Sequence, residues 1–139
     1  MTSARGQGWV RIVALLDLVV TAPLAVPELS NAWAALLLSG FGFIGPASAY
    51  VPMPLTTSVF CVLAGILGVL WNGCRLIRPD AFLVRADFWG RLAVATALIY
   101  FLVMHQAPGI LWLFVGTELA GALIERRALS GMRSGGGWA

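Results

Sequence analysis

The charged residues of this chain are confined to a few short segments, and this distribution limits what the chain can fold into. All nine basic residues are arginines, and they form three groups: Arg5 and Arg11; Arg75, Arg78, Arg85 and Arg91; Arg126, Arg127 and Arg133. Long and almost uncharged stretches separate the groups. In membrane proteins, arginine collects near the ends of spans that stay on the cytoplasmic side. The distribution therefore predicts a membrane protein whose arginines set its topology.

The composition leads to the same class. Hydrophobic residues make up 60% of the 139 residues and charged residues 11%, whereas soluble domains have about 45–50% apolar and about 25% charged residues. The formal net charge of +3 would point to nucleic acid in a soluble protein. Because the arginines here flank apolar stretches, we expect anionic lipid headgroups as the counter-charge, and no nucleic acid as a partner.

Five apolar stretches are candidates for membrane spans, since a span needs about 20 mostly apolar residues. They are residues 9–26, 32–50, 55–77, 89–105 and 108–124. If all five crossed, the middle arginine group would face the opposite side from Arg5 and Arg11. If the second stretch does not cross, all nine arginines lie on one side. Glycine and proline are frequent between Ser39 and Pro54 and weaken a regular helix there, which favours the second arrangement.

The sequence thus predicts an all-α integral membrane protein of one domain. We expect a four-transmembrane-helix bundle with spans at about 9–26, 55–77, 89–105 and 108–124, and a non-spanning apolar outer-face segment at 27–54. Both termini would be cytoplasmic, in the inner membrane of a bacterium, and residues 130–139 would form a flexible tail. A cleaved signal peptide is the rival interpretation of the first span, but Asp17 within its apolar core argues against cleavage.

The two cysteines do not form a redox or metal site. Cys61 and Cys74 are 13 positions apart in one apolar stretch, which is roughly 20 Å along a helix and too far for a disulfide. The chain has no CxxC motif and no Cys/His spacing typical of a metal site. We predict no metal.

Five polar residues from four predicted spans fall at a similar depth: Asp17, Asn72, Arg75, Arg91 and Glu118. A lone charge inside a bilayer is costly, so such groups face the bundle interior and pair. We expect Asp17 and Glu118 to be neutralised by Arg75 and Arg91, with Asn72 between them. One interpretation is interhelical adhesion. The other is the polar floor of a pocket for a quinone, isoprenoid or lipid headgroup, or a proton relay, with Asp17 and Glu118 as candidate catalytic acids.

Three further residues are weak candidates for binding a cofactor. His105 is the only histidine, and a second ligand for a haem or chlorophyll would have to come from another chain. Phe41 and Phe43 lie in the outer-face segment, where they could contact a pigment or a prenyl tail. A solvated turn residue and lipid-facing aromatic side chains are the simpler interpretations.

The layout of a first span, an apolar outer-face segment and three further spans with arginine-rich inner ends resembles small bacterial DoxX-like membrane proteins. The resemblance covers residues 9–125 at the level of architecture. That family includes small subunits associated with quinone-linked oxidoreductases, so the resemblance implies an accessory role near a quinone. The vitamin K epoxide reductase layout is also similar, but the CxxC pair of that family is missing here.

Three functions are compatible with these features. The sequence favours a non-enzymatic accessory or structural subunit of a larger respiratory or photosynthetic membrane complex, with other membrane subunits or a second copy as partners. The alternative is a small enzyme or carrier acting on an isoprenoid or quinone, with Asp17 and Glu118 as acid and base. A proton-coupled transporter would need a dimer or tetramer, because four spans enclose little pathway.

Overall fold

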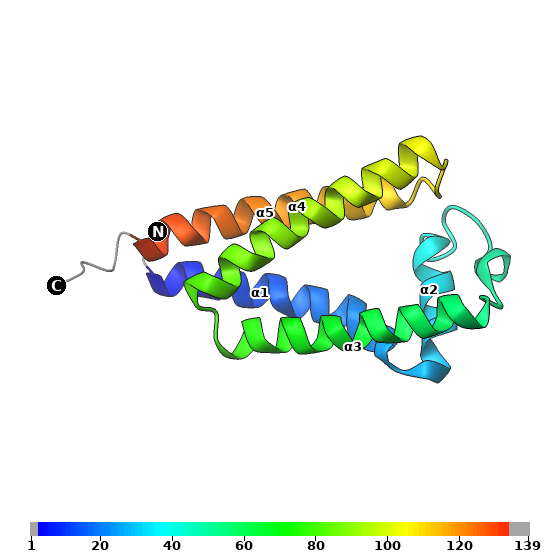
Figure 1. Ribbon diagram of the computed structural model, residues 1–139, viewed down its shortest axis with the longest axis horizontal. Helices are drawn as coiled ribbons and strands as arrows, with labels where there is room; N and C mark the ends of the chain where they lie inside the picture. Colours follow the sequence, from blue (N-terminus) through cyan, green and yellow to red (C-terminus); the bar gives the residue numbers. More distant parts are fainter. Residues whose placement is uncertain (1–2, 134–139) are drawn as a thin grey trace. The chain divides into compact units, whose positions relative to one another are not determined.

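A computed structural model describes residues 3–133, and within these residues all regular structure is helical, with five α-helices and no strand. The elements follow the chain in the order shown in Figure 1: α1 (Ser3–Thr21), η1 (Ala22–Ala25), α2 (Pro27–Leu38), η2 (Ala47–Tyr50), α3 (Leu55–Ile77), α4 (Ala81–Met104) and α5 (Leu111–Arg133). Both η elements are short 3-10 helices. The predicted all-α class is confirmed.

Three helical segments are long and apolar enough to cross a membrane: Gly6–Ala25, Leu55–Ile77 and Ala81–Met104. They match three of the predicted spans. By contrast α2 has 12 residues and rises only about 18 Å, which is short of the roughly 30 Å of a bilayer core. The 23-residue α5 is long enough, but Glu118, Glu125 and the arginines that follow lower its hydropathy.

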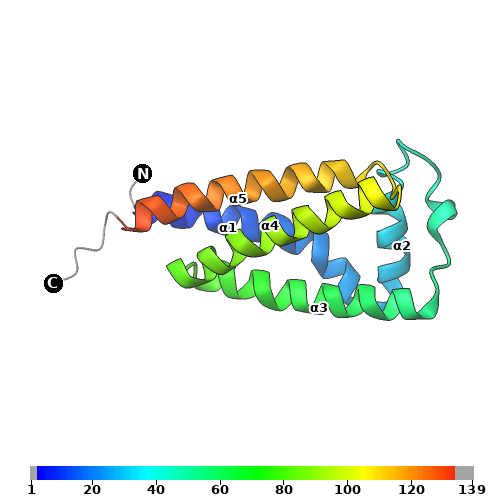
Figure 2. The same cartoon turned by 45° about the horizontal axis from the view of Figure 1, so that its top comes forward.

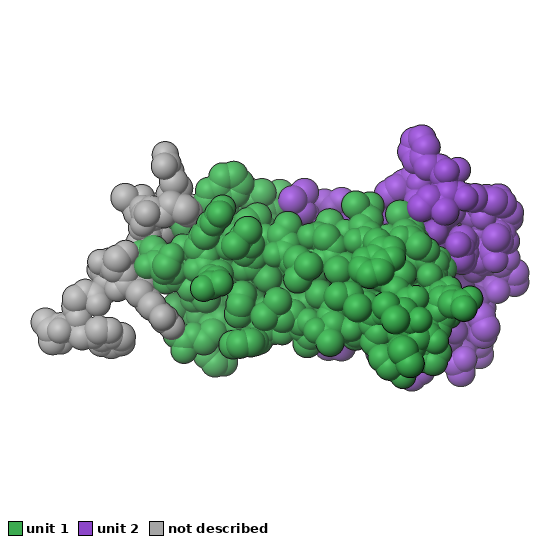
Figure 3. Space-filling view, turned by 90° about the horizontal axis from the view of Figure 1, so that it is seen from above, with its two compact units in different colours: residues 1–15, 74–139 green, residues 16–73 purple. Residues whose placement is uncertain are grey.

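The chain divides into two compact units, coloured separately in Figure 3. Unit 1 comprises residues 1–15 and 74–139, and unit 2 comprises residues 16–73. In unit 1, α4 and α5 run side by side along their length, as the two views in Figures 1 and 2 agree. Each unit is described separately below.

The core of unit 1 brings together the helix ends that carry the arginines. Val10 of α1, Val84 of α4 and Ala128 of α5 form one buried cluster. A Cβ built on Gly6 would lie 3.5 Å from the backbone of Ala128, so the first turns of α1 also pass close to the end of α5. The start of α1, the start of α4 and the end of α5 therefore meet at one end of unit 1, and these segments carry Arg11, Arg85, Arg91, Arg126 and Arg127.

The start of α4 lies earlier in the chain than predicted. The side chain of Asp80 accepts hydrogen bonds from the backbone N–H groups of Phe82 and Leu83, at 3.0 and 2.9 Å. This N-cap satisfies two of the free amides at a helix start, so α4 begins at Ala81 rather than at Trp89. The predicted third span, 89–105, covers the later part of this helix.

Helix α5 extends beyond the predicted last span. The last span was expected to end at 124 and a flexible tail to begin at 130, whereas α5 continues to Arg133. Ala128 and Leu129 pack in the unit 1 core, and this packing extends the helix beyond the apolar stretch. The rest of the expected tail, residues 134–139, lies outside the described residues.

In unit 2, the segment 27–54 is tied to the helices on either side of it. The indole N–H of Trp33 donates to the carbonyl of Val20 at 2.8 Å. Asn31 donates to the hydroxyl of Ser58 at 3.2 Å and accepts from the backbone N–H of Met53 at 3.1 Å. Within unit 2 these bonds hold α2 against the end of α1 and the start of α3.

A glycine permits the closest helix contact in unit 2. A Cβ built on Gly65 of α3 would lie 2.3 Å from the backbone nitrogen of Ala25 and 2.5 Å from the carbonyl carbon of Leu24. Any side chain at this position would overlap the main chain of η1. Gly65 therefore sets how closely α3 approaches the end of the first helical segment, as small residues do between helices in lipid.

The replacement Gly65→Ala tests this contact. We expect it to lower the free energy of unfolding by roughly 1–3 kcal/mol, because main-chain atoms must move to admit the methyl group. The measurement is thermal unfolding in one mild detergent. Gly73→Ala on the same helix is the matched control, since a Cβ there meets nothing within 4 Å. Equal melting temperatures for the two variants would contradict the contact.

Candidate functional site

Five charged side chains from three helices form one ion-pair network in unit 1. Arg75 of α3 contacts Asp87 of α4, with its Nη2 2.9 Å from Oδ2, and also pairs with Glu125 of α5. Arg91 of α4 contacts three acids: Asp87 at 2.9 Å, Glu118 at 3.0 Å and Glu125 at 3.4 Å. Each guanidinium thus bridges several carboxylates, and the network joins the end of α3 to the α4–α5 pair.

The network is buried. The side chains of Arg75 and Glu125 have no exposed surface, whereas 24% of the Glu118 side chain is exposed. Removing one partner of a buried ion pair costs about 3–5 kcal/mol, because the other charge is left unpaired in an apolar surrounding. The five residues therefore constrain how α3, α4 and α5 fit together at this end of unit 1.

Residue spacing explains why the side chains meet. Asp87 and Arg91 are four residues apart, so they share one face of α4. Glu118 and Glu125 are seven residues apart on α5, and Gly121 lies between them on the same face. A Cβ on Gly121 would lie 2.7 Å from Nη1 of Arg91, so the glycine leaves the space that this guanidinium occupies.

Three of the five residues of the predicted polar cluster are members of the network. Arg75, Arg91 and Glu118 belong to the network. Asp17 and Asn72 fall in unit 2; Asn72 is buried, and the backbone carbonyl of Asp17 accepts a hydrogen bond from the hydroxyl of Thr21 at 2.9 Å.

The prediction missed two members of the network, Asp87 and Glu125. Asp87 lies two residues before the predicted third span, which begins at Trp89, and it was not included in the predicted cluster. Glu125 lies one residue beyond the predicted end of the last span at 124, and it was not included in the predicted cluster. A signal for each was present, namely the i,i+4 spacing of Asp87 to Arg91 and the common helix face of Glu118 and Glu125.

The weak cofactor candidates are not among the five residues of the network. His105 follows α4, is exposed, and its ring centroid lies 5.4 Å from that of Tyr100. Phe41 packs edge-to-face on Trp33 at 6.1 Å, and Phe43 is 94% exposed. Among residues 3–133, no three His, Cys, Asp or Glu side chains are arranged to hold a metal ion.

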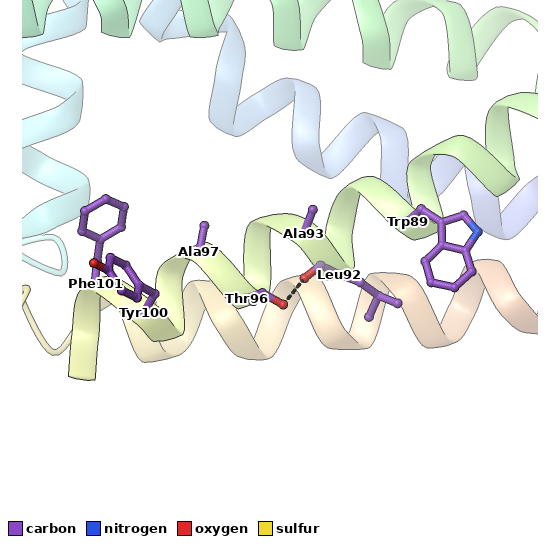
Figure 4. Close-up of a pocket in the computed structure, with 7 residues that line it drawn as sticks. All are labelled: Trp89, Leu92, Ala93, Thr96, Ala97, Tyr100 and Phe101. Carbon is purple, nitrogen blue, oxygen red and sulfur yellow. Dashed lines mark hydrogen bonds between the residues drawn. The ribbon is translucent and has the colours of Figure 1, made fainter. Parts of the chain in front are cut away.

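Two shallow hollows in unit 1 are lined by residues that do not belong to the network. The first, the α4 groove, runs along one helix face, with Trp89 at one end and Tyr100 and Phe101 at the other (Figure 4). Leu92 and the smaller side chains of Ala93, Thr96 and Ala97 lie between them. The second, the turn hollow, lies where α3 passes into α4 and is lined by Cys74, Ile77, Arg78, Asp80, Phe82 and Leu83. Neither hollow therefore gives access to the buried charges.

No family model, curated protein or solved structure matches this chain. The DoxX-like resemblance stays a prediction.

The replacement Arg75→Gln tests whether the network is structural. We expect a loss of about 3–5 kcal/mol in the free energy of unfolding, because Asp87 and Glu125 would lose a shared counter-charge. Arg78→Gln, three residues along the chain and exposed, should change it by less than about 0.5 kcal/mol. Both are measured by chemical or thermal unfolding in detergent.

The double replacement Arg75→Gln with Glu125→Gln supplies the control. Removing the acid as well as the base should recover about 1–3 kcal/mol relative to the single Arg75 variant. The single variant Glu125→Gln is measured as well. If the loss of unfolding free energy in the double variant equals the sum of the losses in the two single variants, the pair does not interact.

Proposed function

We propose that this chain is a non-enzymatic accessory or structural subunit of a larger membrane complex. The main support for this proposal is that the buried charged side chains of the network form ion pairs with one another. Arg75 contacts two carboxylates and Arg91 contacts three. A network of this kind fixes helix register, whereas a catalytic site keeps a reactive group accessible to substrate.

The outer faces of the helices suit association with other spans. Only 17% of each candidate membrane-spanning window is buried within the chain. In lipid, small residues let helices approach closely, and α5 carries such a patch at Gly116 and Ala120, both exposed. Lipid, a second copy and other subunits could all cover these faces. The DoxX-like resemblance adds proximity to a quinone as the expected setting.

The proposed topology has four crossings, with α5 as the fourth and segment 27–54 on the outer side. It is supported by the meeting of the arginine-bearing ends of α1, α4 and α5 in unit 1. Ends that lie together share one membrane face, and an arginine-rich face is expected to be cytoplasmic. Both termini would then be on the cytoplasmic side of a bacterial inner membrane.

Cysteine labelling tests the topology. In a variant with Cys61 and Cys74 replaced by serine, single cysteines are introduced by Glu28→Cys, Gly109→Cys or Arg126→Cys, all at exposed positions. An impermeant thiol reagent added to intact cells should label positions 28 and 109, and should label position 126 only after permeabilisation. Opposite accessibility of positions 28 and 109 would overturn the four-span arrangement.

Gentle solubilisation tests the role as a subunit. We expect the chain to co-purify from its native membrane with stoichiometric amounts of at least one larger membrane protein, detected by mass spectrometry of the intact assembly. When expressed alone it should aggregate or be lost, because exposed helix faces lack their partners. A stable, monodisperse monomer with no partner in both preparations would contradict the proposal.

An enzyme or carrier for an isoprenoid or quinone is the second candidate, with Asp17 and Glu118 as acid and base. It is favoured by the partial exposure of Glu118, the most accessible acid of the network. Quinone and isoprenoid extracted from the purified chain would be compared with the amounts in Glu118→Gln and Asp17→Asn variants. Loss of bound quinone at unchanged expression and oligomeric state would favour this candidate over the first.

A further inference from the structure

The arginine-rich end of unit 1 carries a large excess of exposed positive charge. Its two inward arginines, Arg75 and Arg91, are engaged by carboxylates. Five others are exposed on the same segments: Arg11, Arg78, Arg85, Arg126 and Arg127. Among the described acidic residues of this unit, only Asp80 is exposed at the surface rather than buried or half-buried. Charge of this sign and density attracts anionic headgroups at a membrane surface.

The exposed carboxylate of Asp80 already accepts hydrogen bonds from the backbone of α4. One oxygen of Asp80 accepts both hydrogen bonds of the α4 N-cap. Its carboxylate is thus held toward the backbone of α4, although it stands two residues from Arg78. The ion pairs described above all involve Arg75 or Arg91, so the guanidinium of Arg78 is available to an external anion.

The turn hollow sets apolar surface directly beside this guanidinium. Ile77 and Phe82 line the hollow together with Arg78, and 74% and 77% of their respective surfaces are exposed. A ligand that fits both features needs a negative headgroup and an apolar chain. Guanidinium binds phosphate oxygens through two parallel hydrogen bonds, so a phosphate headgroup matches Arg78.

We propose that the turn hollow binds an anionic phospholipid, with the phosphate on Arg78 and the first part of an acyl chain along Ile77 and Phe82. This site is independent of the proposed function, because it requires neither a partner subunit nor a substrate. It would place an ordered lipid at the α3–α4 turn, on the arginine-rich face.

The test measures lipid retained by the purified chain in detergent, by native mass spectrometry. Phosphatidylglycerol and phosphatidylcholine with identical acyl chains are titrated separately. We expect phosphatidylglycerol to bind at least about tenfold more tightly. Arg78→Gln should remove about tenfold of that affinity, in line with the loss of a charge-assisted hydrogen bond. Arg126→Gln is the matched control and should change the affinity by less than about twofold.

Several results would overturn the site. Equal losses in the Arg78 and Arg126 variants would show diffuse charge attraction. Equal binding of the two lipids would show that the headgroup is not recognised. Displacement of phosphatidylglycerol by millimolar inorganic phosphate would assign the site to the free anion. Phe82→Ala gives an independent check, because it should weaken phosphatidylglycerol binding while leaving the charge of the site intact; unchanged binding would remove the acyl-chain contact from the proposal.

Discussion

The cost of an unpaired charge in an apolar interior is the constraint on which the rest of unit 1 depends. Arg75 and Arg91 would each be strongly unfavourable without counter-charges. Their acids come from α4 and α5, so the charges are satisfied only when the helices are in register. Within unit 1 the network therefore fixes the register of the end of α3, α4 and α5, which apolar contacts alone would leave poorly specified.

The same residue type serves two purposes in this chain. Arg75 and Arg91 are turned into the protein, where they hold helices together. The exposed arginines Arg11, Arg78, Arg85, Arg126 and Arg127 lie at the surface of the same unit. Arginine suits both roles, because its planar guanidinium binds several oxygens at once and stays charged at any physiological pH. Glycine has a matching role, since Gly121 leaves room for the guanidinium of Arg91.

Hydropathy predicted the helical class and the three long apolar helices. The glycines and prolines of segment 27–54 predicted that it holds no long helix. The membership of the ion-pair network was only partly predictable. Arg75, Arg91 and Glu118 were identified because each interrupts an apolar stretch. Asp87 and Glu125 were not, because they lie beyond the apolar stretches and their helices extend past those limits. A cap at Asp80 and packing of Ala128 decide these helix ends, and neither is visible in hydropathy.

The distribution of acids and bases along α4 and α5 has a consequence for biogenesis. α4 carries Asp87 and Arg91, which compensate each other within one helix. α5 carries Glu118 and Glu125, whose counter-charges reside on other helices. If α5 crosses the membrane as proposed, its entry alone would expose two carboxylates to hydrocarbon, and the translocon scale gives about 2.5–3.5 kcal/mol for one aspartate at the centre of a span. The short connection between Met104 and Leu111 would then favour insertion of α4 and α5 together as a hairpin, in which Arg91 already faces the carboxylates of α5.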